Sequence, residues 1–193
     1  MGRFDHFSLL APFYDRIFAA PDPAWLRQLL ALPAGRLLDA GGGTGRVAAT
    51  LVGLADLIVV TDLSAAMLRE ARARDGLCPA RAHAERLPFP AASFDRVLVV
   101  DAFHHFCDQE QAAGELLRVL APGGRLVIEE PNIERWPVRL IALGERLALM
   151  GSRFHRPDAM RRMFEARGGR VTLHVDDAIS TWVVVEKPLG YSG

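Results

Sequence analysis

Two groups of residues in this sequence have the types and spacing that chemistry requires. The first is the segment "DAGGGTGR", residues 39–46, which places bare backbone beside a carboxylate and a guanidinium. Glycines occur together where a turn needs a positive φ or where a ligand packs against the main chain. The second is the pair His104 and His105, whose imidazoles can accept a proton near neutral pH. The sequence therefore predicts a ligand-binding turn and a nearby candidate base.

Three kinds of ligand use such a turn. A phosphate-binding P-loop is excluded because the Lys-Ser/Thr pair that should end it is absent. A dinucleotide remains an alternative, since residues 43–48 fit G-x-G-x-x-A and Asp62 follows Gly43 by 19 residues. Asp39 disfavours that alternative, because its negative charge would face the pyrophosphate. A cationic ligand without phosphate, such as S-adenosylmethionine (SAM), fits this acid better.

The elements that must position these groups follow an alternating pattern. Short runs rich in Val, Leu and Ile predict buried parallel strands, separated by amphipathic segments that predict helices. The predicted strands are 35–40, 56–62, 94–101 and 124–130, with a weaker edge strand at 78–82 that contains Pro79. The predicted helices are 64–74, 108–120 and 157–167, and Pro122-Gly123-Gly124 is expected to end the second of them.

The C-terminal part of the chain has a different pattern. Residues 170–188 read as two extended runs with a turn near Asp176 and Asp177, which predicts an antiparallel hairpin at the edge of the sheet. The expected fold class is therefore α/β, a Rossmann-like doubly wound sheet of seven strands, mostly parallel, with an antiparallel C-terminal hairpin strand. We expect one domain over 1–193, with a helical N-terminal segment over 1–33 and a substrate-cap insert over 131–157.

The order of four motifs resembles a known family. "LLDAGGGTGRVAATL", "VVTDLSAAMLREARAR", "AERLPFPAASFDRVLVVDAFHHF" and "LLRVLAPGGRLVIEEPN" follow one another as in class I SAM-dependent methyltransferases. The opening "FSLLAPFYDRI" is similar to that of the ubiquinone/menaquinone-biosynthesis type, also called methyltransferase type 11. The resemblance covers nearly the whole chain. It implies SAM as cofactor, S-adenosyl-L-homocysteine as product, and methyl transfer to a small acceptor.

The resemblance also implies which residues bind the cofactor. Gly41 and Gly43 would lie against its methionine part and ribose, Asp39 would face its cationic end, and Asp62 would accept hydrogen bonds from both ribose hydroxyls. The remaining cofactor-binding residues implied by the family pattern are Tyr14, Leu63, Met67, His83, Ala84 and Asp101. His83 stands where relatives usually have an acid, so either its imidazole accepts a hydrogen bond from adenine or it lies exposed in a loop.

His104 and His105 follow a predicted strand, beside the position expected for the transferred methyl group. They are the candidate bases for an acceptor that must lose a proton. No metal site is expected, because adjacent ligands on one short loop give poor tetrahedral geometry. The Asn/Asp-Pro-Pro-aromatic signature of many amine-methylating relatives is absent, which favours C- or O-methylation.

The region after the last parallel strand is the most individual part of the sequence. Residues 131–170 contain nine arginines and four acids. This excess of positive charge fits either an anionic or amphiphilic acceptor or a solvated helical face. Apolar residues recur at helical spacing at Trp136, Leu140, Leu143, Leu147 and Met150, so this stripe either packs on the core or caps an apolar acceptor pocket.

The overall composition excludes several classes of partner. Acidic and basic residues balance at 23 each, so no net charge favours nucleic acid or an anionic membrane. No apolar run is long enough for a membrane span, and neither a signal peptide nor a cysteine framework is present. We therefore expect a cytoplasmic protein without stable membrane insertion. A non-catalytic SAM-binding protein and an NAD(P)-dependent oxidoreductase remain the alternative functions.

Overall fold

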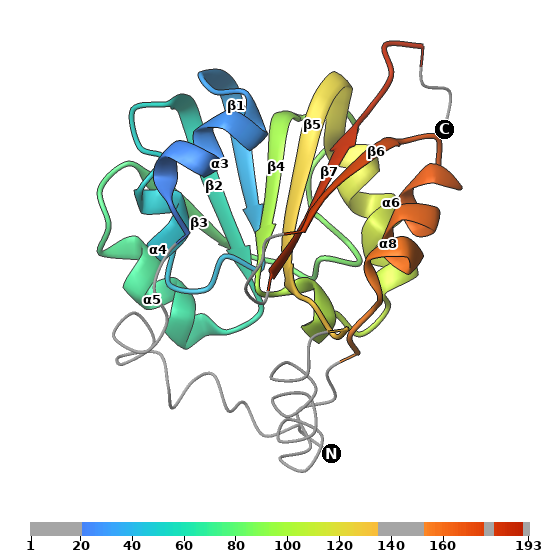
Figure 1. Ribbon diagram of the computed structural model, residues 1–193. Helices are drawn as coiled ribbons and strands as arrows, with labels where there is room; N and C mark the ends of the chain where they lie inside the picture. The colour runs from blue at the N-terminus through green and yellow to red at the C-terminus, as the bar shows by residue number, and fades with distance from the viewer. Residues whose placement is uncertain (1–20, 135–152, 176–179, 191–193) are drawn as a thin grey trace.

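The computed structural model describes residues 21–134, 153–175 and 180–190. Its centre is one sheet of seven strands in the order β3-β2-β1-β4-β5-β7-β6 (Figure 1). The first five strands are parallel, whereas β7 runs antiparallel to both β5 and β6. This confirms the predicted fold class. The strands are β1 (Ala34–Ala40), β2 (Ala55–Asp62), β3 (Leu77–Arg81), β4 (Phe94–Val100), β5 (Leu120–Pro131), β6 (Arg170–Val175) and β7 (Ser180–Glu186).

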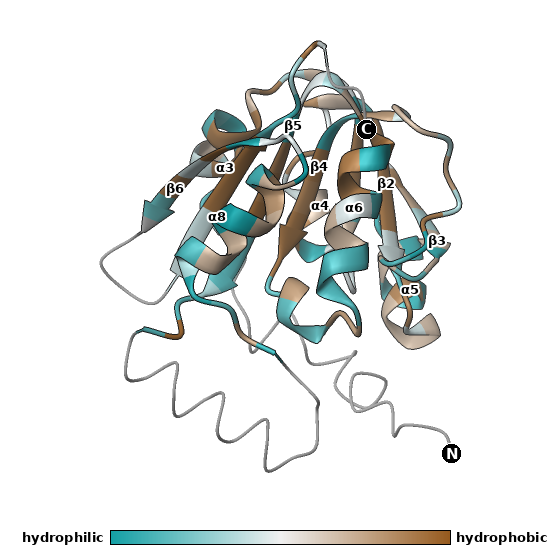
Figure 2. Cartoon of the chain, turned by 90° about the vertical axis from the view of Figure 1, so that its right-hand side faces the viewer, coloured by the Kyte–Doolittle hydropathy of each residue, from teal (hydrophilic) through white to brown (hydrophobic). Residues whose placement is uncertain are grey.

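Helices cover both faces of the sheet, with α3 and α4 packed on one face and α6 and α8 on the other (Figures 1 and 2). The helices of the described residues are α3 (Pro23–Leu30), α4 (Arg46–Ala49), α5 (Ala65–Arg72), α6 (Gln109–Val119) and α8 (Pro157–Glu165), and residues Phe103–His105 form the 3-10 turn η2. The central strands are apolar on both sides, as Figure 2 shows by their brown colour. Burial on both faces explains why these strands read as continuous apolar runs rather than alternating ones.

Two helices have side-chain caps at their N-termini. Ser64 accepts a hydrogen bond from the Met67 amide at 3.4 Å. Asp108 accepts one from the Gln111 amide at 3.0 Å. The Gln111 side chain does not return a hydrogen bond to Asp108, since it donates to the carbonyl oxygen of Glu85. Instead the carboxylate of Glu85 accepts from the Asp108 amide at 3.3 Å, so the cap is completed from a distant loop.

The prediction for the Pro122-Gly123-Gly124 segment was wrong in its detail. α6 ends at Val119, before this segment, and the three residues lie inside β5 at an irregularity in its pairing with β4. A Cβ on Gly124 would lie 2.7 Å from the carbonyl oxygen of Ala121, so the strand passes this point only with a glycine. Pro79 lies in β3, at the edge of the sheet as predicted.

Some expectations fall on residues outside those described. Tyr14, the apolar stripe from Trp136 to Met150, and the turn at Asp176 and Asp177 are among them. The division into a helical segment over 1–33 and a cap insert over 131–157 therefore remains a prediction. Among the helices of the described residues, none combines the length and apolarity needed to cross a membrane.

Candidate functional site

A cavity of about 330 Å³ lies at the C-terminal ends of β1, β2 and β4. The chain runs outward from β1 through β2 to β3 and then returns to the other side of β1 as β4. The turns that follow β1 and β4 therefore diverge and leave a crevice, which is where open α/β sheets bind their ligands. Eight of the ten predicted cofactor-binding residues line this cavity: Asp39, Gly41, Gly43, Asp62, Leu63, Met67, Ala84 and Asp101.

The glycine turn between β1 and α4 forms one wall of the cavity. Gly41 has a φ of +75°, and a Cβ there would lie 2.8 Å from the Cβ of Ala102. A side chain at this position would therefore collide with the turn after β4. Around Gly43 the surroundings are open, because a Cβ would meet nothing closer than 3.9 Å. Gly41 is required for packing, whereas Gly43 leaves its backbone open to a ligand.

Asp62, the last residue of β2, organises the turn on the other side. One carboxylate oxygen, Oδ2, accepts a hydrogen bond from the Gly43 amide at 3.0 Å. The other, Oδ1, accepts from the Ser64 amide at 2.8 Å. The carboxylate is half-buried and lines the cavity, and each of its oxygens has a second lone pair. Asp62 is therefore held in place at the cavity wall, where a carboxylate suits the two hydroxyls of a vicinal diol.

Asp39 has the most unusual environment in the cavity. Its side chain is 1% exposed, and neither carboxylate oxygen has a hydrogen-bond partner among the described residues. Gly42 packs directly over it, since a Cβ there would lie 2.5 Å from Oδ2. Burial raises the pKa of Asp39 to about 7, and the charge of Asp62 adds to this shift, whereas the charge of Arg46 and the nearby backbone amide of Ala48 oppose it. A buried acid without a partner is costly, so Asp39 is suited to a cationic ligand that supplies the missing charge.

Further acids gather beside Asp39 at the ends of β4 and β5. Asp101 lines the cavity with a φ of +52°, an uncommon conformation for a residue with a side chain and one that is often found at functional sites. Its amide donates to the carbonyl oxygen of Glu129 at 3.0 Å. Burial raises the pKa of Glu129 to about 7. The charges of Asp101 and Glu130 increase this shift, and the hydrogen bond from Ser180 and the charge of Arg46 oppose it.

The sequence analysis did not assign a role to Arg46, Glu129 or Glu130. Arg46 lines the cavity, and its positive charge opposes the rise in the pKa of both Asp39 and Glu129. The signal for the two glutamates was present in the sequence, because two consecutive acids end an otherwise apolar strand. Both are less than a tenth exposed.

The opposite end of the cavity is apolar. Leu63, Met67, Ala82 and Ala84 line it, and this wall can take the flat face of a base. The amide of Ala84 makes no hydrogen bond within the described part of the chain, which leaves one donor for a ligand. His83 does not line the cavity, since its side chain is 65% exposed and its Nδ1 lies 3.7 Å from Glu85.

The two histidines of η2 have different surroundings. His105 lines the cavity and is half-buried. His104 does not line it, because the 3-10 turn directs its ring into the core, where it is 2% exposed. Its Nδ1 lies 2.7 Å from the carboxylate of Glu130, whose other oxygen accepts from the Phe103 amide at 2.8 Å. The geometry therefore favours His105 over His104 as a group that contacts a substrate.

The segment that leads into α8 attaches to the same turn. The ring of Phe154 stacks on His104 with centroids 4.4 Å apart, and the Arg153 amide donates to the His104 carbonyl at 2.8 Å. The side chain of Gln109 donates to the Arg153 carbonyl at 2.7 Å. Within the described residues no cluster of acids, cysteines and histidines has the arrangement of a metal site.

Comparison with known proteins identifies the fold and its cavity. Residues 38–128 match the model of the methyltransferase domain family. This segment, just under half of the chain, is similar to a methyltransferase domain. The matched residues run from β1 to β5 and include every element that lines the cavity. The family implies SAM as the cofactor, and the cavity fits it, since an unpartnered buried acid, a held carboxylate and an apolar wall suit its cation, ribose and base.

Relatives of this methyltransferase domain include enzymes of quinone biosynthesis. A demethylmenaquinone methyltransferase of Thermus thermophilus is 43% identical over 64% of this chain and 63% of its own length. A ubiquinone/menaquinone biosynthesis C-methyltransferase of Hahella chejuensis is 38% identical over 49% of this chain and 42% of its own. The chain thus spans about two fifths to three fifths of these relatives.

Solved structures share the fold over more of the chain. A SAM-dependent methyltransferase of Thermotoga maritima, described as a possible histamine N-methyltransferase, superposes with a TM-score of 0.76. It covers 94% of this chain and 97% of its own and is 24% identical. At this identity the likeness supports the fold of the methyltransferase domain and not its acceptor.

Proposed function

We propose that this protein transfers the methyl group of SAM to a small or lipophilic acceptor, with methylation of carbon or oxygen. The observation that carries the proposal is the carboxylate of Asp39, which is buried at the cavity wall with no hydrogen-bond partner among the described residues. A ligand that brings a positive charge offsets the desolvation of this acid. A dinucleotide would bring two phosphates to the same place and increase the repulsion, so this observation argues against an oxidoreductase.

The proposed binding mode uses three parts of the cavity. Asp62 accepts hydrogen bonds from the ribose hydroxyls while the Gly43 amide keeps its carboxylate in place. The apolar wall formed by Leu63 and Met67 contacts the adenine, and the Ala84 amide donates to a ring nitrogen. Asp39 stabilises the cationic end. SAM supplies an electrophilic methyl group on a sulfonium, so the protein has to orient the acceptor in line with it and exclude water.

The acceptor side of the cavity contains His105, Phe106 and Asp101. For a phenol or quinol acceptor we propose that His105 removes the hydroxyl proton as the new bond to the methyl group forms. Two relatives that methylate quinone precursors by name make an aromatic quinol the first acceptor to test. The arginine excess of residues 131–170 is consistent with an anionic or amphiphilic acceptor. Exposed thiols at Cys78 and Cys107 suit the cytoplasm.

The cofactor is tested first by thermal melting with SAM, S-adenosylhomocysteine, NAD and NADP. We expect SAM and S-adenosylhomocysteine to raise the melting temperature and the two dinucleotides to leave it unchanged. Stabilisation by NAD alone would refute the proposal.

Catalysis is tested separately by incubating the protein with SAM and a panel of quinols, phenols, small amines and lipids. Formation of S-adenosylhomocysteine that depends on the acceptor is the expected result. Binding of SAM without turnover on any acceptor would instead support the non-catalytic SAM-binding function.

A further inference from the structure

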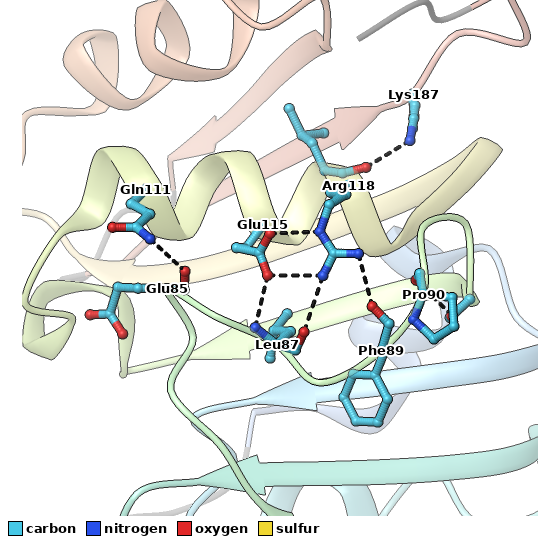
Figure 3. Close-up of polar contacts among 10 residues, drawn as sticks. Glu85, Leu87, Phe89, Pro90, Gln111, Glu115, Arg118 and Lys187 are labelled. Carbon is cyan, nitrogen blue, oxygen red and sulfur yellow. Dashed lines mark hydrogen bonds and ion pairs between the residues drawn. The ribbon is translucent and has the colours of Figure 1, made fainter.

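The loop that follows β3, residues 82–90, is held in place by side chains from one face of α6. Gln111, Glu115 and Arg118 lie four and three residues apart, so they project from the same side of the helix. Figure 3 shows all three pointing at the backbone of the loop. Apart from an isolated bridge, this loop lies outside the strands of the sheet, and the helix supplies partners that a neighbouring strand would otherwise give.

Glu115 and Arg118 make the central contacts. Their side chains form a two-point ion pair, with Nε to Oε1 at 2.6 Å and a second nitrogen to Oε2 at 2.9 Å. Glu115 also accepts from the Leu87 amide at 2.8 Å. Arg118 donates to the carbonyl oxygens of Leu87 at 3.1 Å and Phe89 at 2.8 Å. One ion pair therefore fixes three backbone groups of the loop.

A further contact lies next to the cavity. The Gln111 side chain donates to the carbonyl oxygen of Glu85 at 3.0 Å. The carboxylate of Glu85 accepts from the Cys107 amide at 2.7 Å, at the start of α6. The residue that follows Ala84 is thus bound to the helix by both its backbone and its side chain.

These contacts decide where Ala84 lies. Its side chain has one carbon, and its amide has no partner within the described residues, so it has little to fix it from the cavity side. On the β3 side the Ala82 amide donates to the Asp62 carbonyl at 3.2 Å. On the other side the position of Ala84 depends on the attachment of residues 85–89 to α6. A displacement of a few tenths of an ångström would misdirect its N–H.

We propose that Glu115 and Arg118 are positioning residues that set the selectivity of the cavity for adenine, because they fix the backbone of residues 87–89 and through it the position of Ala84. The proposal rests on the proposed SAM-binding function. Adenine N1 is an acceptor that the Ala84 amide can satisfy, whereas N1 of hypoxanthine carries a hydrogen and would place two donors together. A correctly held amide therefore favours S-adenosylhomocysteine over S-inosylhomocysteine.

The test measures the dissociation constants of these two compounds by calorimetry for Arg118→Met and Arg118→Lys. Arg167 provides matched controls, Arg167→Met and Arg167→Lys. Like Arg118, Arg167 donates to two carbonyl oxygens and pairs with a glutamate, in this case Glu110 at 2.7 Å. The two arginine side chains are also similarly exposed, 28% for Arg167 and 36% for Arg118. Its contacts join α8 to α6 and do not reach the loop. All measurements are made well below the melting temperature of each variant.

We expect Arg118→Met to weaken binding of S-adenosylhomocysteine about tenfold and to reduce the preference over S-inosylhomocysteine by a similar factor, as the loss of one well-placed hydrogen bond would. Arg118→Lys should also weaken binding, because one ammonium cannot reach both carbonyls in the same geometry. Its effect should be smaller than that of Arg118→Met, because lysine keeps a positive charge beside Glu115. Both Arg167 variants should keep the wild-type preference. If Arg118→Met fails to fold, Arg118→Lys decides the question.

Two results would overturn the inference while the proposed function stands. One is that the wild-type protein binds S-adenosylhomocysteine and S-inosylhomocysteine with the same dissociation constant. The other is a pair of Arg118 variants that lose stability but keep the wild-type ratio of the two constants, which would show a structural role only. A wild-type protein that binds neither compound would refute the proposed function itself.

Discussion

The amide of Gly43 donates to Oδ2 of Asp62 at 3.0 Å, and this hydrogen bond ties the turn after β1 to the end of β2. The second oxygen of the same carboxylate accepts from Ser64. Only a carboxylate satisfies both amides, because an amide side chain has a single acceptor oxygen. The residue proposed to bind ribose therefore also fixes the shape of the glycine turn.

Replacement of Asp62 by Asn or Ala should remove SAM binding. Asn leaves one of the two amides facing its NH₂ group and loses one of the two ribose contacts. We expect the dissociation constant to rise at least about 100-fold, since hydrogen bonds to charged groups contribute about 1.5–3 kcal/mol each. Calorimetry with S-adenosylhomocysteine measures it. An unchanged constant would place the ribose site elsewhere.

The affinity for SAM should rise with pH around neutrality. Burial raises the pKa of Asp39 to about 7 in the empty site, and a cation binds the ionised form more strongly. Affinity should therefore increase about tenfold between pH 6 and pH 7.5, as the ionised fraction does. The Asp39→Asn variant should bind SAM weakly and lack this increase. A wild-type affinity that is flat over this range would contradict the assignment.

The same residue should make the empty protein less stable as pH rises. The pKa of Asp39 is about 7 in the folded state and 3.8 for an ordinary aspartate. Between these two pH values the folded protein therefore keeps a proton on Asp39 that the unfolded protein has lost. Stability contributed by this group is therefore lost from about pH 4 to pH 7. Asp39→Asn should raise the free energy of unfolding by about 2 kcal/mol more at pH 8 than at pH 5. Urea unfolding measures it, with exposed Asp75→Asn as the control.

Glu129 should show the same direction without the link to the cofactor. Burial raises its pKa to about 7, with Asp101 and Glu130 adding to the shift and Ser180 and Arg46 opposing it. Glu129→Gln should therefore stabilise the empty protein more at pH 8 than at pH 5. Because Glu129 does not line the cavity, the dissociation constant of SAM should change by less than about threefold, which corresponds to under 1 kcal/mol. A loss as large as that of Asp39→Asn would mean that Glu129 contacts the ligand.

His104 and His105 should respond differently to replacement by alanine. His104→Ala removes the histidine partner of the buried Glu130 carboxylate and leaves it only the Phe103 amide, so we expect a loss of about 3–5 kcal/mol in unfolding free energy. His105→Ala should leave stability nearly unchanged but slow methylation of a hydroxyl acceptor by about 10²-fold or more if it acts as the base. Urea unfolding and single-turnover rates separate the two. Equal effects on stability would refute the different placement of the rings.

The sequence predicts the elements and the cavity-lining residues that follow strands, because those depend on local pattern and on the parallel arrangement. Asp39 and Asp62 are found this way. It does not distinguish His104 from His105, since a difference of one position in a 3-10 turn decides which ring enters the core. The Glu85 cap on α6 and the Arg118 contacts join residues more than 20 positions apart, and the amphipathic pattern of either segment does not contain the partner.

The position of β7 between β5 and β6 has a consequence for how the chain assembles during synthesis. Residues 170–175 leave the ribosome before residues 180–186, yet their sheet neighbour among the described residues is the later strand. The open edge of β5 likewise stays without this neighbour until residues 180–186 have been made. The residue after β7, Lys187, then donates to the carbonyl oxygens of Leu117 and Leu120 at the end of α6. Completion of the sheet therefore depends on a segment made after β6, and until then β5 presents an unpaired edge to other chains.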